Sequence, residues 1–262
     1  MAVDVDGTLV DSNGAITGET KKAVRLGVDK GLIFTICTGR PIQSAAPLCE
    51  ELGLDLPFIT YNGAMVVMGK SREILYEKKM SAEDALNIYK LGEKYGVTVV
   101  VWTENKLYVN RMDERAHSYS KLARTTPILP DNMTDVLKNG ATKILWYDTE
   151  EKIRQYEDEV GQYLGENVNY HPSKPIFLEF VDKNASKAIA MERLGQYFGI
   201  DRREMIAVGD GINDLSMIEY AGLGIAMANA REEVKQKAGY VTLSNDEDGV
   251  AHAIYKFVLN MD

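Results

Sequence analysis

The feature that most constrains the fold is a set of short, continuous apolar runs that alternate with helix signals. Residues 32–37 read LIFTIC, an apolar and β-branched run typical of a strand buried on both faces. The pattern before it predicts a helix over residues 17–31, with Thr17 as N-cap and a glycine at its end. A second helix pattern follows over residues 41–53. This alternation predicts an α/β fold, a Rossmann-like parallel sheet covered by helices.

The alternation is interrupted in the middle of the chain. The sequence predicts a hairpin with its turn at Gly69-Lys70 and a second hairpin over residues 97–110. Predicted helices and strands then follow one another in mixed order. From about Ser186 the strand–helix rhythm returns. We therefore expect two domains, a core that the chain leaves and re-enters and an inserted α+β domain. The expected core comprises residues 1–81 and 184–262, and the insert comprises residues 82–183.

Composition and charge exclude several classes of protein. The formal net charge of −9 disfavours nucleic acid, whose phosphate backbone selects basic surfaces. No apolar run reaches membrane-spanning length, and the first residues carry no basic-plus-apolar leader. Cys37 and Cys49 lie in apolar contexts and are interpreted as reduced core thiols. We expect a cytoplasmic protein with neither nucleic-acid nor membrane partners.

Polar residues follow three of the apolar runs, at the points where the predicted strands end. In an open α/β sheet, ligands bind beyond the carboxyl ends of the strands, so these residues should gather at one edge. At this strand end the chain can turn at Gly7, so one of Asp4 and Asp6 can face the reacting centre while the other lies across from it, which predicts different roles for the two. The residues at the three strand ends are Asp4, Asp6, Gly7, Thr8, Thr38, Gly39, Arg40, Asp210, Gly211, Asn213 and Asp214.

Carboxylates packed so closely repel one another and resist ionising together, and a divalent cation removes this conflict. Ligands that are all hard oxygens favour Mg²⁺. Together with Lys187, a hydroxyl and glycine amides, the metal would form a box for phosphate, and a carboxylate can act as the nucleophile. Taken alone, an Asp-x-Asp-Gly sequence is more typical of a turn and Lys187 of a solvated helix. Their occurrence in order at successive strand ends favours a site.

The quoted motifs resemble a known family. DVDGTLVDS, TGRP, the Lys187 segment DKNASKAIAM and GDGINDLSMI are similar to the four motifs of the haloacid dehalogenase-like (HAD) superfamily of phosphatases. YNGA and the late AMANAREEVKQKAGYVTLSNDEDGVA are typical of its Cof-type branch, subclass IIB, with a large cap. The resemblance covers nearly the whole chain. It implies a Mg²⁺-dependent phosphatase that hydrolyses small phosphomonoesters, such as sugar phosphates, through an aspartyl-phosphate, with the insert as the cap.

The resemblance also implies a role for individual residues. Asp4 would be the nucleophile and a metal ligand. Asp6 would act as general acid and base and bind the metal through its main-chain carbonyl, and Lys187 would neutralise the phosphate and restrain Asp4. The remaining metal ligands would be Asp210 and Asp214, the remaining phosphate-binding groups Val5, Thr38, Gly39 and Asn213, and the candidates for contacting the leaving group Arg40 and Asn62.

Two alternatives remain open on the same fold. A hexose phosphomutase or phosphotransferase would keep the phosphoryl group and pass it to a sugar. A non-catalytic phosphometabolite sensor would bind without turnover, which the presence of both Asp4 and Asp6 disfavours. The expected partner is a small phosphorylated metabolite, and the sequence leaves open whether the protein is a monomer or a homodimer.

Overall fold

The computed structural model describes residues 1–261, and the chain divides into two compact units. The first unit contains Met1–Thr38, Ala45–Leu75 and the chain from Ser186 onward. The second contains Tyr76–Ala185 together with the short segment Gly39–Ser44. The sequence placed the boundaries near residues 81 and 183 and kept residues 39–44 with the first part. The roles of core and cap for these units stay a prediction.

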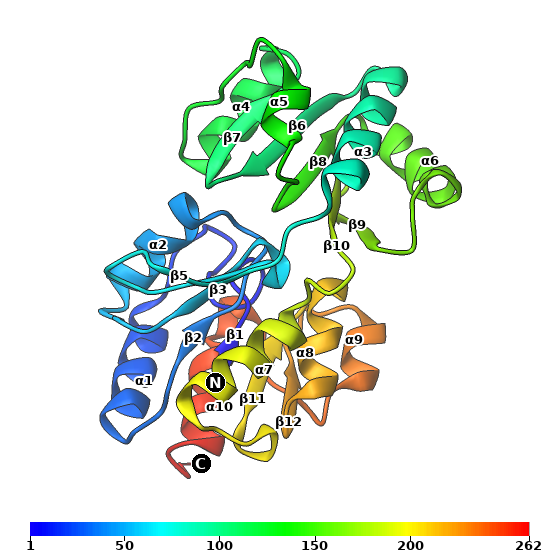
Figure 1. The fold of residues 1–262 in the computed structure, drawn as a ribbon. Helices are drawn as coiled ribbons and strands as arrows, with labels where there is room; N and C mark the ends of the chain where they lie inside the picture. The colour runs from blue at the N-terminus through cyan, green and yellow to red at the C-terminus, as the bar shows by residue number, and fades with distance from the viewer. Residues whose placement is uncertain (262) are drawn as a thin grey trace. The chain divides into compact units, whose positions relative to one another are not determined.

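The first unit is built on a five-stranded parallel sheet with strand order β13-β12-β11-β1-β2 (Figure 1). This confirms the predicted parallel sheet. Strand β1 lies between β2 and β11, and pairing with β1 covers only two residues of β2, which is why β2 is shorter than the apolar run that predicted it. The strands are β1 (Ala2–Val3), β2 (Thr35–Ile36), β11 (Ile206–Gly209), β12 (Leu223–Ala226) and β13 (Tyr240–Val241).

Helices flank this sheet. Thr17 caps the first helix as predicted, because its hydroxyl accepts the Thr20 N–H at 3.0 Å. Helix α1 packs against α10, and α7 packs against α8. Among residues 1–261, no helix has both the length and the apolar character needed to cross a membrane. The helices are α1 (Gly18–Asp29), α2 (Ile42–Glu51), α7 (Lys187–Phe198), α8 (Leu215–Tyr220), α9 (Glu232–Lys237) and α10 (Gly249–Phe257).

A small antiparallel ribbon follows β2, with β3 (Phe58–Thr60), β4 (Met65–Val67) and β5 (Ile74–Glu77) in that order. A single parallel bridge from Cys37 to Ile59 joins β3 to the edge of the main sheet. Between β3 and β4 lies the short 3₁₀ turn η1 (Tyr61–Gly63), which packs against α7. The turn therefore supports the helix on which Lys187 lies.

The second unit contains a five-stranded antiparallel sheet of order β7-β6-β8-β10-β9. Its tight hairpin turns at Glu104 and Asn105, both at positive φ, as a two-residue turn between twisted strands requires. The strands are β6 (Thr98–Thr103), β7 (Lys106–Val109), β8 (Lys143–Tyr147), β9 (Val168–Lys174) and β10 (Phe177–Asp182), and the helices are α3 (Ala82–Tyr95), α4 (Glu114–Ala123), α5 (Met133–Leu137) and α6 (Glu150–Val160).

The second unit has its own core. Apolar residues of β6, β8 and β10 pack with α3, α5 and α6 into one cluster that includes Trp146 and Phe180. On neighbouring strands, Lys143 and Glu179 form a buried ion pair at 3.0 Å. The insert is therefore a packed α+β unit, as its mixed pattern predicted.

Gly63 provides a test of how tightly η1 is fitted to α7. It has φ +93°, and a Cβ on it would lie 2.1 Å from the Ser186 carbonyl oxygen. Gly14 also has positive φ, +79°, but a Cβ there meets open space. Gly14→Ala should cost about 1–2 kcal/mol of unfolding free energy from backbone strain alone. Gly63→Ala should cost about 1–3 kcal/mol more, because the backbone must also move apart.

Urea unfolding of the two variants beside the wild type measures this difference. Equal losses of unfolding free energy in the two variants would contradict the close approach of η1 to the start of α7.

Candidate active site

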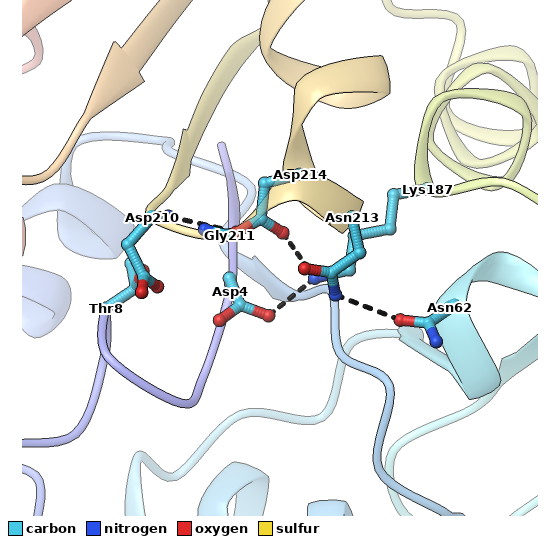
Figure 2. Close-up of polar contacts among 8 residues, drawn as sticks. All are labelled: Asp4, Thr8, Asn62, Lys187, Asp210, Gly211, Asn213 and Asp214. Carbon is cyan, nitrogen blue, oxygen red and sulfur yellow. Dashed lines mark hydrogen bonds and ion pairs between the residues drawn. The ribbon is translucent and has the colours of Figure 1, made fainter. Parts of the chain in front are cut away.

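Three carboxylates meet at the carboxyl edge of the parallel sheet. Asp4 directly follows β1, and Asp210 directly follows the neighbouring β11. The Asp4 N–H continues the pairing by donating to the Val208 carbonyl at 2.9 Å. Each of Asp4, Asp210 and Asp214 offers a carboxylate oxygen, and these oxygens lie within 4.8 Å of one another. Because adjacent parallel strands end at the same edge, residues about 200 positions apart in sequence converge here (Figure 2).

The Asp214 carboxylate is held by the turn in which it lies. It ends the 3₁₀ turn η4 (Ile212–Asp214), and its Oδ2 accepts the N–H groups of Asp210 and Gly211 at 3.0 and 2.8 Å. The side chain is fully buried. A Cβ on Gly209 would lie 2.5 Å from this side chain, so only glycine leaves room for it.

Lys187 joins two of the carboxylates. It is the first residue of α7, and its Nζ lies 2.5 Å from both Asp4 Oδ1 and Asp214 Oδ1. The residue is only 1% exposed. Burial by itself lowers the pKa of Lys187, but the neighbouring Asp214 and Asp4 outweigh burial and leave that pKa raised. Lys187 is therefore a permanently charged ammonium fixed between two carboxylates.

Negative charge exceeds positive charge in this cluster. Burial, followed by the charge of Asp214, raises the pKa of Asp4 against the opposing effect of Lys187. Burial also raises the pKa of Asp210 to about 6, although the Thr8 hydroxyl donates to its Oδ1 at 2.7 Å. Three carboxylates against one ammonium leave a deficit of positive charge that a divalent cation can fill, and hard oxygen ligands suit such a cation.

Amide side chains lie beside Lys187. The Asn213 side chain donates to Asn62 Oδ1 at 3.1 Å (Figure 2). The Asn62 N–H donates to the carbonyl of the buried Thr38, which follows β2. The structure thus gathers Thr38, Asn62 and Asn213 into one connected group, next to the lysine that holds Asp4.

The other predicted site residues lie differently. The Asp6 side chain is exposed and is not one of the three clustered carboxylates, so its surroundings differ from those of Asp4. Val5 is fully buried, and its carbonyl accepts the N–H groups of residues 8–10. Gly39 and Arg40 fall in the second unit. Sequence reasoning gave no role to Thr8, although its hydroxyl directly follows Gly7 in the first motif.

Comparison with known proteins identifies the family. The family model for haloacid dehalogenase-like hydrolases matches residues 1–254. A Bacillus subtilis 5-amino-6-(5-phospho-D-ribitylamino)uracil phosphatase, YcsE, is 33% identical, over 99% of this chain and 95% of its own length. The crystal structure of a haloacid dehalogenase-like hydrolase from Bacteroides thetaiotaomicron superposes with a TM-score of 0.86 at 31% identity, covering 97% of each chain.

A solved subclass IIB sugar phosphatase, BT4131, superposes with a TM-score of 0.84 at 29% identity, covering 98% of this chain and 97% of its own. The chain belongs to the haloacid dehalogenase-like hydrolase family, and it is an enzyme of the phosphatase type. These findings confirm the resemblance that the four sequence motifs carry.

Lys187 can be tested for its electrostatic role. Lys187→Met leaves two buried carboxylates without their cation, so we expect a loss of about 3–5 kcal/mol of unfolding free energy at neutral pH. This loss of unfolding free energy should become smaller in acid, because protonation removes the repulsion between the two carboxylates. Lys237→Met, which removes an exposed partner of Glu219, should change stability by less than about 1 kcal/mol. Urea unfolding in EDTA measures the unfolding free energy of both variants. Similar losses in Lys187→Met and Lys237→Met would contradict the electrostatic role of Lys187.

Proposed function

We propose that this enzyme is a Mg²⁺-dependent phosphatase that hydrolyses small phosphomonoesters through an aspartyl-phosphate on Asp4. The observation that carries the proposal is the contact of Lys187 Nζ with Asp4 Oδ1 at 2.5 Å. This contact restrains one oxygen of Asp4 and leaves the other for attack on phosphorus. Phosphoryl transfer depends mainly on such positioning and on neutralising charge.

In the first step, an oxygen of Asp4 attacks the phosphorus of the substrate. The bond between phosphorus and the ester oxygen breaks, and Asp6 donates a proton to the departing oxygen. The alcohol leaves, and the phosphoryl group remains on Asp4 as an acyl phosphate. The exposed position of Asp6, outside the carboxylate cluster, suits a group that must exchange protons.

In the second step, Asp6, now ionised, takes a proton from water as the water oxygen attacks phosphorus. The bond from phosphorus to Asp4 breaks, which releases inorganic phosphate and restores the Asp4 carboxylate. Lys187 stays charged throughout and offsets the negative charge that Asp4 and the phosphate share. The proposed phosphate-binding groups are Lys187, the Val5 and Gly39 amides, Thr38 and Asn213.

The acidic cluster supports a resident metal ion. The side chains of Asp4, Asp210 and Asp214 and the Asp6 carbonyl would hold Mg²⁺, with Asp214 acting directly or by orienting Lys187. When bound, Mg²⁺ neutralises the excess negative charge and orients the phosphate for in-line attack. The donors are all hard oxygens, the type of ligand that Mg²⁺ prefers.

The names of the relatives support a substrate class. One relative acts on a phosphorylated ribitylamino compound, and one structural neighbour is a sugar phosphatase. We propose sugar or polyol phosphates, or similar metabolites, with Arg40 and Asn62 contacting the leaving group. In this proposal the inserted residues 82–183 form a cap that selects the substrate and excludes water.

Release of inorganic phosphate from a panel of phosphomonoesters, with Mg²⁺ and with EDTA, tests the proposed function. We expect release in Mg²⁺ that EDTA abolishes. Asp4→Asn should lower kcat by at least about 10⁴-fold, because the nucleophile is lost. Asp135→Asn, at an exposed position in the insert, is the control and should leave kcat unchanged.

Two results would contradict the phosphatase proposal. An isomeric sugar phosphate in place of inorganic phosphate would identify a phosphomutase. Binding of phosphate esters without turnover by the folded wild type would identify a sensor.

Metal binding should depend on pH through Asp210. A raised pKa means that the proton favours the folded state, so the metal-free protein loses stability as pH rises from 3.8 toward about 6. Mg²⁺ competes with that proton, and at 100 times its Kd it should add about 2.7 kcal/mol of stability. The Mg²⁺-induced rise in Tm should therefore be large at pH 7.5 and shrink as pH falls below about 6.

Thermal unfolding at pH 7.5 and 5, with Mg²⁺ or EDTA, measures this rise. In Asp210→Asn, Mg²⁺ should raise Tm only slightly at both pH values. An equal rise in Tm at pH 5 and pH 7.5 in the wild type would rule out Asp210 as a ligand.

A further inference from the structure

The loop that follows the nucleophile is tied down by side chains more than 200 residues away in sequence. Asn229 Nδ2 donates to the Gly7 carbonyl at 2.8 Å, and Asn245 Nδ2 donates to the Val10 carbonyl at 3.0 Å. The Ser12 N–H donates to Asp246 Oδ1 at 2.7 Å. Three successive points of residues 7–12 are therefore held from outside, all within the first unit.

The two asparagines also hold each other. The Asn245 N–H donates to Asn229 Oδ1 at 3.1 Å, so the Asn229 amide accepts with one end and donates with the other. Asn229 lies between β12 and α9, and Asn245 begins the 3₁₀ turn η5 (Asn245–Glu247). One rigid pair of amides thus reaches two carbonyls of the loop.

The hydrogen bond from Asn229 is exposed, and the one from Asn245 is partly buried. Asn229 is exposed, and Asn245 is only partly buried. A hydrogen bond that water can replace contributes only about 0.5–1.5 kcal/mol to stability. The pair therefore adds little to folding, whereas it fixes where the loop lies.

Asp6 lies where the held loop begins. Its backbone forms an isolated parallel bridge with Val10, whose carbonyl Asn245 holds. The next residue, Gly7, has φ +84°, and a Cβ there would lie 2.5 Å from Asp210 Oδ2. On the inner side, the Val5 carbonyl accepts the N–H groups of residues 8–10. The backbone on either side of Asp6 is therefore held by two sets of hydrogen bonds, those accepted by the Val5 carbonyl and those donated by Asn229 and Asn245.

We infer that Asn229 and Asn245 are positioning residues that hold residues 7–12 so that Asp6 stays in place for proton transfer. The inference rests on the proposed function, in which Asp6 protonates the departing oxygen. It assigns a catalytic consequence to two amides, one exposed and one partly buried, whose hydrogen bonds reach the loop and not the carboxylate cluster or Lys187.

The inference predicts a dependence on the leaving group. An alkyl ester needs a proton on its departing oxygen, whereas p-nitrophenolate leaves readily without one. Displacing Asp6 should therefore slow transfer from an alkyl phosphate and spare transfer from p-nitrophenyl phosphate. A general loosening of the site would slow both esters alike.

The experiment is single-turnover formation of phosphoenzyme, by acid quench, from p-nitrophenyl phosphate and from the best alkyl phosphate of the panel. Asn229→Ala and Asn245→Ala should slow the alkyl ester by about 10- to 100-fold, as expected for a misplaced catalytic group, and the aryl ester by less than about threefold. Asp6→Asn should show the same selectivity, more strongly. The matched control is Asn87→Ala, an exposed asparagine that donates to the Tyr163 carbonyl at 2.9 Å, and it should change neither rate.

Hydrogen exchange gives a second readout that is independent of activity. Amides of residues 7–12 should exchange faster in Asn229→Ala and Asn245→Ala than in the wild type or in Asn87→Ala, while α7 keeps its protection. Unchanged exchange in this segment overturns the inference. So do equal losses with the two esters, or no loss with either. A folded wild type that transfers phosphate from neither ester overturns the proposed function instead, and the exchange result then shows whether the asparagines hold the loop.

Discussion

The contact of one buried ammonium with two buried carboxylates organises this molecule. Lys187 Nζ lies 2.5 Å from both Asp4 and Asp214, and these residues come from the two ends of the chain. Removing Lys187 would leave two buried carboxylates without their counter-charge, which is costly. The start of α7, the end of β1 and the turn after β11 are therefore fixed relative to one another by charge as well as by packing.

The parallel sheet makes that contact possible. Because β1 lies between β2 and β11, the residues after three strands share one edge, and η1 supports the helix that supplies Lys187. The same arrangement leaves Asp6 one step outside the cluster, on a loop held by Asn229 and Asn245. Asp4, the proposed nucleophile, is buried in the charged cluster, whereas Asp6, the proposed proton carrier, is exposed, although the two residues lie only two positions apart at one strand end.

Periodicity and capping predicted most of the helices and strands of the first unit, because each depends on local signals such as Thr17 and the apolar run at residues 32–37. The convergence of Asp4 and Asp210 also followed from the rule that parallel strands end at one edge, whereas the place of Lys187, at the start of a helix, does not follow from that rule. Helices α4 and α5 carried no strong pattern and were not predicted. Thr8 was placed at a strand end without a role, and Asn229 and Asn245 were not singled out, since a polar residue in a loop gives no sign of the partner it will meet.

The sequence by itself determined the class of fold, the family and the set of polar residues at the strand ends, because these depend on residue types and their spacing. Only the tertiary structure decided which of those residues touch. It paired Lys187 with both Asp4 and Asp214, placed Asn213 against Asn62, and grouped residues 39–44 with the second unit. The physical reason is that hydrogen bonds and ion pairs depend on distances of a few ångströms between residues far apart in the chain, and only the packed fold sets those distances.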